Sequence, residues 1–405
     1  MESNLEERKI LLVLVIIMYS AFYIGGHISY GGLIAYVSVL TLVGFILLYT
    51  RGRIVLRLSY LIIYVILFCA YCYMSVFWAD NASYTLDKAY DLLWIAVLTL
   101  IVYIVYQNSN TIDPLLKVIM WLGFAISTYA ILYYGWSTIW LSIVGGIRIP
   151  NDAINSNSLG MMSAFAVLIN IYYILYDKFK WWTIFSVVAL IAMLASESRK
   201  ALFVLVVGVF IIFILKNIDN THVINSILRV VTVMILLIVV FYFLSKLSYF
   251  TSVNSRIELA ISAFTGNGGD YSTLARIKLI QIGKELFRQH PVLGVGMDNA
   301  KIYGGIAFGK DEYYLHNNFI ELLADGGIIA FILYYSIYLI VGVKLFRDRN
   351  FRDREYNICL VFFIVRLVID YGMVSYDERY TYVFILMLYL KTEIDIRTKR
   401  ELKLE

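Results

Sequence analysis

Residues 32–50 form the run GLIAYVSVLTLVGFILLYT, which contains no charged side chain. A membrane-spanning helix needs about 20 mostly apolar residues, so this run predicts one. The whole chain has the same character, because 61% of its 405 residues are hydrophobic, 16% are charged and the mean hydropathy is +0.77. A typical soluble domain is about 25% charged. The composition therefore disfavours a soluble enzyme, and the 34 tyrosines exclude a disordered chain.

Apolar runs of this kind recur along the chain, bounded by polar or glycine-rich breaks. They predict twelve helices, at residues 10–25, 32–50, 58–78, 90–106, 115–135, 157–176, 181–196, 200–215, 227–246, 318–343, 356–374 and 379–391. A transmembrane β-barrel would instead show strands of about ten residues with alternating hydrophobicity. The sequence therefore predicts an all-α polytopic membrane protein with about 12 transmembrane helices.

The distribution of basic residues orients these helices. With the N-terminus inside, most lysines and arginines fall in inner segments, and the short outer loops hold only Lys88, Arg148, Arg199, Lys200 and Arg379. The positive-inside rule favours this orientation and makes both termini cytoplasmic. The expected divisions are nine spans within 1–246, an extracytoplasmic loop at 247–312, three spans within 313–391 and a cytoplasmic tail at 392–405.

The outer loop at 247–312 is too long to be an idle connection in a compact protein. Residues 272–289 are predicted to form a helix, with Ser272 or Thr273 as its cap and Pro291 just beyond its end. The segment 291–296, PVLGVG, is rich in turn residues. We expect the function to lie here, on the outer face of the membrane.

Several kinds of site have no support in the sequence. There is no Gly-x-x-x-x-Gly-Lys-Ser/Thr phosphate loop, no His/Cys cluster with metal spacing and no Asp-x-Asp in the outer loop. Gly294-x-Gly296 lacks the third glycine of a dinucleotide site, so it predicts a turn. The inner basic residues are spread over many segments, which does not indicate nucleic-acid binding.

Three outer arginines are candidates for binding an anion. Arg199 opens a predicted helix, whose N-terminal dipole favours a bound anion, and a membrane-surface charge is the alternative. Arg276 lies on the predicted loop helix, where the alternative is a solvated surface residue. Arg148 precedes the polar cluster 155–158, for which capping of the next helix is the alternative.

The chain has four histidines, His27, His222, His290 and His316. Only His316 combines an outer position with a helix start and neighbouring polar amides, and an imidazole can accept a proton near neutral pH.

Several charged residues fall within apolar runs, where charges are costly, among them Glu321, Asp325, Arg366 and Asp370. Arg366 and Asp370 are spaced to pair within one helix. Structural pairing and the lining of a site both remain open for these four.

In this order, several segments resemble the bacterial O-antigen polymerase and O-antigen ligase superfamily. They are NSNSLG at 155–160, SRKAL at 198–202, ARI at 275–277, HPVLGVG at 290–296 and HNNFIELLADGGII at 316–329. The strong part of the resemblance covers residues 145–345, and the N-terminal helices match only in being hydrophobic.

The resemblance implies a multi-helix glycosyltransferase of GT-C-like architecture on the outer face of the bacterial cytoplasmic membrane. Its donor would be an undecaprenyl-diphosphate-linked oligosaccharide and its acceptor a polysaccharide. It implies that Arg199 and Arg276 bind the donor diphosphate and that His316 is the catalytic group beside the acceptor hydroxyl. It also implies that neither a metal nor a cofactor is needed.

Further candidates for substrate contact are Arg148, Asn157, Lys200, His290, Asn317 and Glu321. Membrane lipid, and a flippase and chain-length regulator of the same pathway, are the expected partners. Two guanidinium groups can neutralise a leaving diphosphate, and a base opposite them suits a single inverting displacement.

Three functions remain open. The first is a polymerase of lipid-linked repeat units of O-antigen, capsule or exopolysaccharide. The second is a ligase that transfers the glycan to lipid A core or another surface acceptor. The third is a polysaccharide or lipid transporter, which Asp91, Arg366 and Asp370 keep open as charges within apolar runs.

Overall fold

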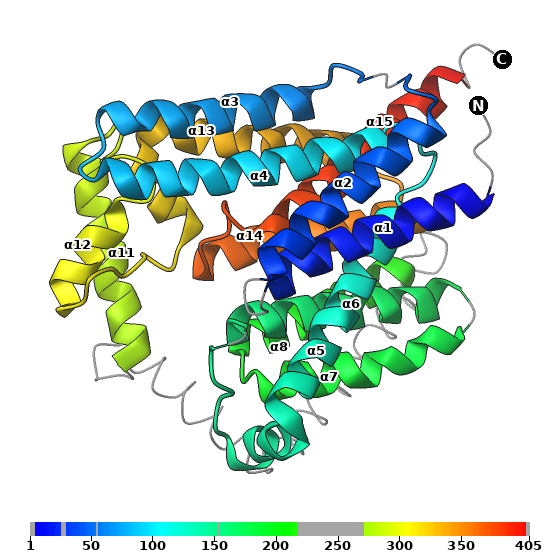
Figure 1. The fold of residues 1–405 in the computed structure, drawn as a ribbon, viewed down its shortest axis with the longest axis horizontal. Coiled ribbons are helices and arrows are strands. Elements are labelled where there is room, and N and C mark those ends of the chain that lie inside the picture. Colours follow the sequence, from blue (N-terminus) through cyan, green and yellow to red (C-terminus); the bar gives the residue numbers. More distant parts are fainter. Residues whose placement is uncertain are drawn as a thin grey trace. The chain divides into compact units, whose positions relative to one another are not determined.

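The computed structural model describes residues 5–25, 30–53, 56–152, 154–177, 179–217 and 271–401. Every regular element within these ranges is a helix (Figure 1), which confirms the predicted all-α class. The predicted span 227–246 and the first part of the predicted outer loop, 247–270, lie outside the described residues, as do His27 and His222.

The described helices follow the predicted apolar runs closely. In chain order they are α1 Leu5–Ile24, α2 Gly31–Tyr49, α3 Tyr60–Met74, η2 Ser75–Phe77, α4 Ala82–Tyr106, α5 Asp113–Gly145, α6 Ser156–Tyr176, η3 Trp181–Ile184, α7 Phe185–Ala195, α8 Arg199–Asn217, α11 Tyr271–Gln289, α12 Ala300–Phe308, α13 Asn318–Arg347, α14 Arg354–Gly372 and α15 Arg379–Glu401. Within the described ranges, seven of them are long and apolar enough to cross a membrane: α2, α3 with η2, α4, α5, α6, α8 and α13. The total of twelve spans stays a prediction.

The chain forms two compact units. Unit 1 contains α1, α2, α5, α6, α7, α8 and the part of α14 up to Val365. Unit 2 contains α3, α4, α11, α12, α13, the part of α14 from Arg366 onward and α15.

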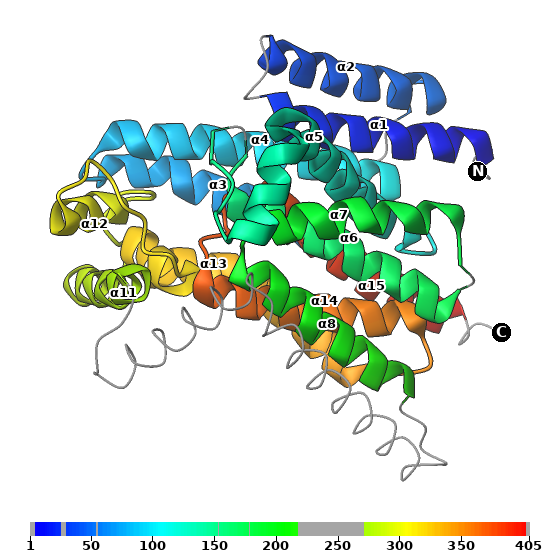
Figure 2. The same ribbon diagram turned by 90° about the horizontal axis from the view of Figure 1, so that it is seen from below.

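In unit 1, α6 is the central helix and packs against α5, α7 and α8, while α1 packs against α2 and α5. Figure 2 shows α1 and α2 lying side by side. Asn155 is the N-cap of α6, because its side chain accepts hydrogen bonds from the backbone amides of Asn157 (2.9 Å) and Ser158 (3.4 Å). Nearly every residue of α6 from Leu159 to Tyr173 is buried, so this helix forms the core of the unit.

In unit 2, α3 packs between α4 and α13, and α15 packs against both α4 and α13. Figure 1 shows α11 and α12 gathered at one end of the long helices α3, α4 and α13. The core is aromatic: the ring of Phe68 lies 5.5 Å from that of Tyr334 and 6.2 Å from that of Tyr376.

The apolar run predicted as one helix at 318–343 is interrupted in the structure. Gly327 has φ 62° and ψ −162°, so α13 consists of two helical pieces joined at this residue. Only glycine adopts such a conformation readily. The interruption frees backbone carbonyls near the start of α13, and these carbonyls position the loop described below.

Candidate functional site

Helix α11 carries Arg276 and is held by one apolar face. Leu279 and Leu286 belong to a buried cluster that also contains Leu315 and Ala324. Gly283 is required at the contact, because a Cβ atom there would lie 2.3 Å from Cγ2 of Ile320. The resulting close packing against the start of α13 fixes the position of α11. Arg276, one turn before Leu279, is half-buried.

The turn segment 291–296 docks onto the interruption of α13. The backbone amide of Val295 donates to the carbonyl oxygen of Ala324 (3.0 Å), and that of Gly296 donates to the carbonyl oxygen of Asp325 (2.9 Å). Gly294 has φ +67°, and a Cβ atom there would lie 2.3 Å from the carbonyl oxygen of Asp325. The glycines of the HPVLGVG segment therefore serve close backbone packing, in agreement with the predicted turn.

Asp325 is fully buried and holds the next helix. Its Oδ1 accepts a hydrogen bond from the backbone amide of Ala300 (2.7 Å), the first residue of α12. This contact is a structural role for a carboxylate that the sequence left open between pairing and site lining.

A charged cluster lies beside this contact. The Asp298 carboxylate is 2.9 Å from Nζ of Lys301 and 3.5 Å from Nζ of Lys88, and Lys88 also contacts Asp377 at 2.5 Å. Burial raises the pKa of Asp298, and the two ammonium groups act against that rise. The cluster joins the loop before α12 to α4 and to the loop before α15.

His316 has a constrained backbone. Its φ of 59° is left-handed, which is uncommon for a residue with a side chain, and such strain tends to occur at functional sites. On one side, the backbone amide of Leu315 donates to Oε2 of Glu321 (2.7 Å). On the other side, Oδ1 of Asn317 accepts from the amide of Ile320 (3.0 Å) and caps α13.

These bonds assign positioning roles to two of the predicted contact residues. Asn317 also donates through Nδ2 to the carbonyl oxygen of Tyr371 (3.0 Å), and the side chains of Asn317 and Glu321 are both buried. Hydrogen bonds to backbone groups therefore hold the turn that presents His316.

Tyr314 connects His316 with Arg276. The rings of Tyr314 and His316 have centroids 4.0 Å apart. Burial raises the pKa of Tyr314 to about 12, the carboxylate of Glu321 acts in the same direction, and the guanidinium of Arg276 acts against it. The ring of His316 thus packs against Tyr314, and the guanidinium of Arg276 lies close enough to influence the same tyrosine. Sequence reasoning missed Tyr314, and its only signal was the Tyr-Tyr pair directly before the HNN segment.

The guanidinium of Arg276 has no counter-ion within the described ranges. Among the residues that the structure describes, no carboxylate forms an ion pair with its guanidinium, whereas Arg288 on the same helix pairs with Glu285 at 3.3 Å. A half-buried guanidinium of this kind suits an anionic ligand.

The structure does not bring His290 to this place. His290 is exposed just beyond the end of α11, 14 residues after Arg276. At 1.5 Å per residue, that separation is about 21 Å along the helix. Its backbone contributes to the docked turn, because its carbonyl oxygen accepts from the amide of Gly294 (3.0 Å).

The predicted pair of Arg366 and Asp370 is present, with 3.1 Å between Nη2 and Oδ1, and both side chains are fully buried. Asp370 also accepts hydrogen bonds from the hydroxyls of Ser375 (2.5 Å) and Tyr335 (3.0 Å). Asn318 extends the network, since its Nδ2 donates to the Tyr335 hydroxyl (2.9 Å). This network joins α13 and α14, which supports structural pairing over the lining of a transport path.

The remaining candidates belong to unit 1. Arg199 and Lys200 open α8 and are half-buried, while Arg148 is exposed in the segment between α5 and α6. Asn157 accepts a hydrogen bond from the hydroxyl of Ser198 (3.4 Å), so it lies beside the start of α8. The two segments NSNSLG and SRKAL are thus neighbours.

Gly160 allows this contact, because a Cβ atom there would lie 2.4 Å from Oγ of Ser196. Ser198 begins α8 by accepting a hydrogen bond from the amide of Ala201 (3.4 Å). Unit 1 therefore brings together Asn157, Arg199 and Lys200, and unit 2 brings together Arg276, His316, Asn317 and Glu321.

Within the described ranges, no group of three or more His, Cys, Asp or Glu side chains is arranged to hold a metal ion. Arg199 at the start of α8 and Arg276 in the second turn of α11 remain candidates for holding an anionic group.

Residues 184–335 match the family model described as O-antigen ligase. This segment contains Arg199, Arg276 and His316. The match confirms the predicted resemblance to the O-antigen ligase and polymerase superfamily, a glycosyltransferase-like family whose substrates are lipid-linked polysaccharides. No curated protein matches the chain.

Proposed function

We propose that this membrane protein polymerises lipid-linked polysaccharide repeat units. In this reaction a glycan moves from undecaprenyl diphosphate to a sugar hydroxyl of a second lipid-linked unit, on the outer face of the cytoplasmic membrane. The observation that carries the proposal is the convergence of Arg276 and His316 on Tyr314, within the segment that matches the family.

The roles follow from the chemistry of a sugar diphosphate. The bond between C1 of the donor sugar and the diphosphate oxygen breaks, and the electron pair remains on the diphosphate. Arg276 neutralises this charge, and the resemblance implies the same role for Arg199. A guanidinium suits this task because it stays charged and can bind two phosphate oxygens at once.

His316 supplies the other half of the reaction. The acceptor hydroxyl oxygen forms the new bond to C1, and its proton passes to the imidazole. A base on the side opposite the leaving diphosphate gives inversion at C1. The hydrogen bonds of Asn317 and Glu321 keep the turn at His316 fixed, so the imidazole needs little reorganisation when the acceptor arrives.

The donor and the acceptor can be tested with membranes that contain the full-length protein. The substrate is a lipid-linked repeat unit alone, and the measurement is product length by gel or mass spectrometry. Arg276→Gln and His316→Ala should each lower the rate by about 10²–10³-fold, by analogy with the loss of one group that stabilises the transition state.

Two matched controls lie on α11 and just beyond its end. Arg288→Gln removes an exposed, paired arginine from α11, and His290→Gln changes the exposed histidine beyond the end of α11. Both should retain near wild-type rates at equal protein levels. Full activity of Arg276→Gln or His316→Ala would contradict the proposed roles.

A ligase is the second candidate, because the matching family model is described as O-antigen ligase. A ligase would leave the lipid-linked unit at its original length until lipid A core or another acceptor is added. Lengthening without that acceptor supports the polymerase, and transfer only after its addition replaces the polymerase with the ligase.

A further inference from the structure

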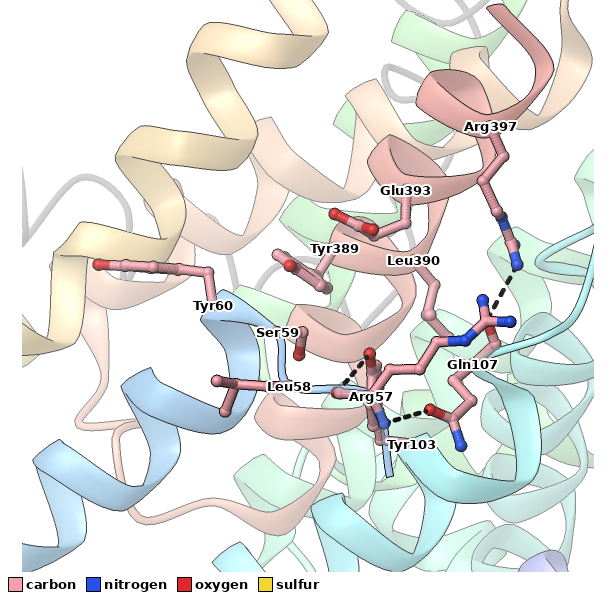
Figure 3. Close-up of a pocket in the computed structure, with 10 residues that line it drawn as sticks. All are labelled: Arg57, Leu58, Ser59, Tyr60, Tyr103, Gln107, Tyr389, Leu390, Glu393 and Arg397. Carbon is pink, nitrogen blue, oxygen red and sulfur yellow. Dashed lines mark hydrogen bonds between the residues drawn. The ribbon is translucent and has the colours of Figure 1, made fainter. Parts of the chain in front are cut away.

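Unit 2 contains a pocket of about 300 Å³ at the end where α3 begins and where α4 and α15 end (Figure 3). Ten residues line it: Arg57, Leu58, Ser59, Tyr60, Tyr103, Gln107, Tyr389, Leu390, Glu393 and Arg397. It lies away from the proposed reaction site. Tyr60 is at the pocket, whereas Tyr71, eleven residues further along α3, donates to the carbonyl oxygen of Gly326 (2.7 Å). That spacing is about 17 Å along the helix.

The pocket is held together by backbone groups. Nη1 of Arg397 donates to the carbonyl oxygen of Gln107 (3.1 Å), and Oε1 of Gln107 accepts from the backbone amide of Arg57 (3.1 Å). The Tyr103 hydroxyl donates to the carbonyl oxygen of Arg57 (3.4 Å). These bonds, drawn in Figure 3, fix the chain before α3 against the ends of α4 and α15.

The charge of the lining is positive. Arg57 and Arg397 contribute two guanidinium groups, and the guanidinium of Arg57 has no ion-pair partner among the described residues. Glu393 is the one acidic residue of the lining, and it already has partners. Its carboxylate lies 3.8 Å from Nζ of Lys344 and accepts a hydrogen bond from Tyr389. An anion that enters the pocket therefore meets two guanidinium groups, and the one carboxylate of the lining faces Lys344.

An apolar rim accompanies these charges. Leu58 lines the pocket and is 80% exposed, and Tyr60, Tyr103, Tyr389 and Leu390 are further lining residues with apolar surface. A guanidinium pair beside an exposed leucine suits a ligand with a charged head and a hydrocarbon tail. Basic pockets between transmembrane helices on the cytoplasmic side bind phospholipid head groups in this way.

We propose that this pocket binds the phosphate group of an anionic phospholipid, on the side of the membrane opposite the proposed reaction site. In the predicted orientation this side is cytoplasmic. The site is independent of the proposed polymerase activity, because none of its lining residues takes part in that reaction.

The test measures lipid retention by the purified full-length protein. Native mass spectrometry follows binding of phosphatidylglycerol, with phosphatidylcholine as the zwitterionic comparison. The double variant R57Q/R397Q should bind phosphatidylglycerol about 30-fold more weakly, from the contribution of each basic residue near an anionic membrane surface. The single variant R57Q should lose about fivefold on the same basis, and it leaves the bond between Arg397 and Gln107 in place.

Two further variants distinguish lipid binding at this pocket from attraction by the net positive charge of the protein. R349Q/R352Q removes two exposed arginines of the segment between α13 and α14, so it changes the net charge equally while leaving the pocket intact. It should bind like the wild type. R57K/R397K keeps both charges and should retain most of the binding, and circular dichroism of each variant checks the fold.

The result that would overturn the proposal is equal retention of phosphatidylglycerol by R57Q, R57Q/R397Q and the wild type. A soluble ligand is distinguished by titration with glycerol phosphate. Arginine-dependent binding of glycerol phosphate, with lipid retention unchanged in the variants, would assign the pocket to a soluble phosphate and would also overturn the lipid proposal.

Discussion

Gly294→Ala tests whether the docked turn at 291–296 depends on close backbone contact. The φ of +67° is left-handed, and placing alanine there costs about 1–2 kcal/mol. The added Cβ would also lie 2.3 Å from the carbonyl oxygen of Asp325, so the turn must move away from α13. That movement weakens the two hydrogen bonds donated by the amides of Val295 and Gly296, each worth about 1 kcal/mol. The expected loss is therefore about 3–4 kcal/mol in the free energy of unfolding.

The matched control is Gly309→Ala. Gly309 has nearly the same φ, +62°, but a Cβ atom there has no neighbour within 4 Å. It should lose only the conformational cost of about 1–2 kcal/mol. The measurement is denaturant unfolding of both purified variants in the same detergent. Hydrogen exchange at the amides of Val295 and Gly296 should accelerate in Gly294→Ala alone.

Equal destabilisation by the two variants would refute this reasoning. It would mean that the left-handed conformation alone requires glycine at 294 and that the contact with α13 contributes nothing measurable. Slow exchange at Val295 and Gly296 in Gly294→Ala would refute it in the same way, because the two hydrogen bonds would then be intact.

Three further predictions concern stability. Gly160→Ala should destabilise the protein by about 1–3 kcal/mol through overpacking against Ser196. Gly44→Ala, which has open space around its Cβ, should be neutral or slightly stabilising. Thermal unfolding of the two variants compares them. Burial and the neighbouring Asp377 raise the pKa of Glu378 to about 7. The folded protein therefore binds this proton more tightly than the unfolded chain, and stability should fall by about 3 kcal/mol as the pH rises from 4.5 to 7. Glu378→Gln should reduce this decline when the free energy of unfolding is measured against pH. An unchanged decline in the variant would contradict the role of Glu378. Lys88→Met leaves the largely buried Asp298 and Asp377 without their shared cation, so it should lower the free energy of unfolding by about 3–5 kcal/mol. A melting temperature equal to that of the wild type would disprove the role of these ion pairs.

The helices could be predicted from the sequence because apolar length is a local property. Eleven of the twelve predicted segments fall on described helices, and the pair Arg366 and Asp370 follows directly from helical spacing. The interruption at Gly327 could not be predicted in this way. The run around it resembles one continuous helix. A Cβ atom at Gly327 would lie 2.3 Å from the carbonyl oxygen of Val292, so the need for glycine there comes from a contact with a distant segment of the chain.

The residue types of the candidate site could be predicted from the sequence. Which of these residues position the site and which contact the substrate could not. Within HNNFIE, the side chains of Asn317, Asn318 and Glu321 all bond to the backbone of the turn at His316 or of neighbouring segments. A sequence pattern cannot separate such positioning residues from reacting ones, because both must be polar and both stand at fixed spacing.

The hydrogen-bond and ion-pair partners in the structure help to distinguish positioning residues from residues that contact the substrate. Asn317 and Glu321 are buried and already hold backbone amides, whereas Arg276 is half-buried without a carboxylate partner among the described residues. A cation in that state is stabilised when an anion binds. The distribution of hydrogen bonds and ion pairs, more than the presence of polar residues in the motif, therefore favours Arg276 as a residue that contacts substrate, and Asn317 and Glu321 as residues that hold the turn at His316.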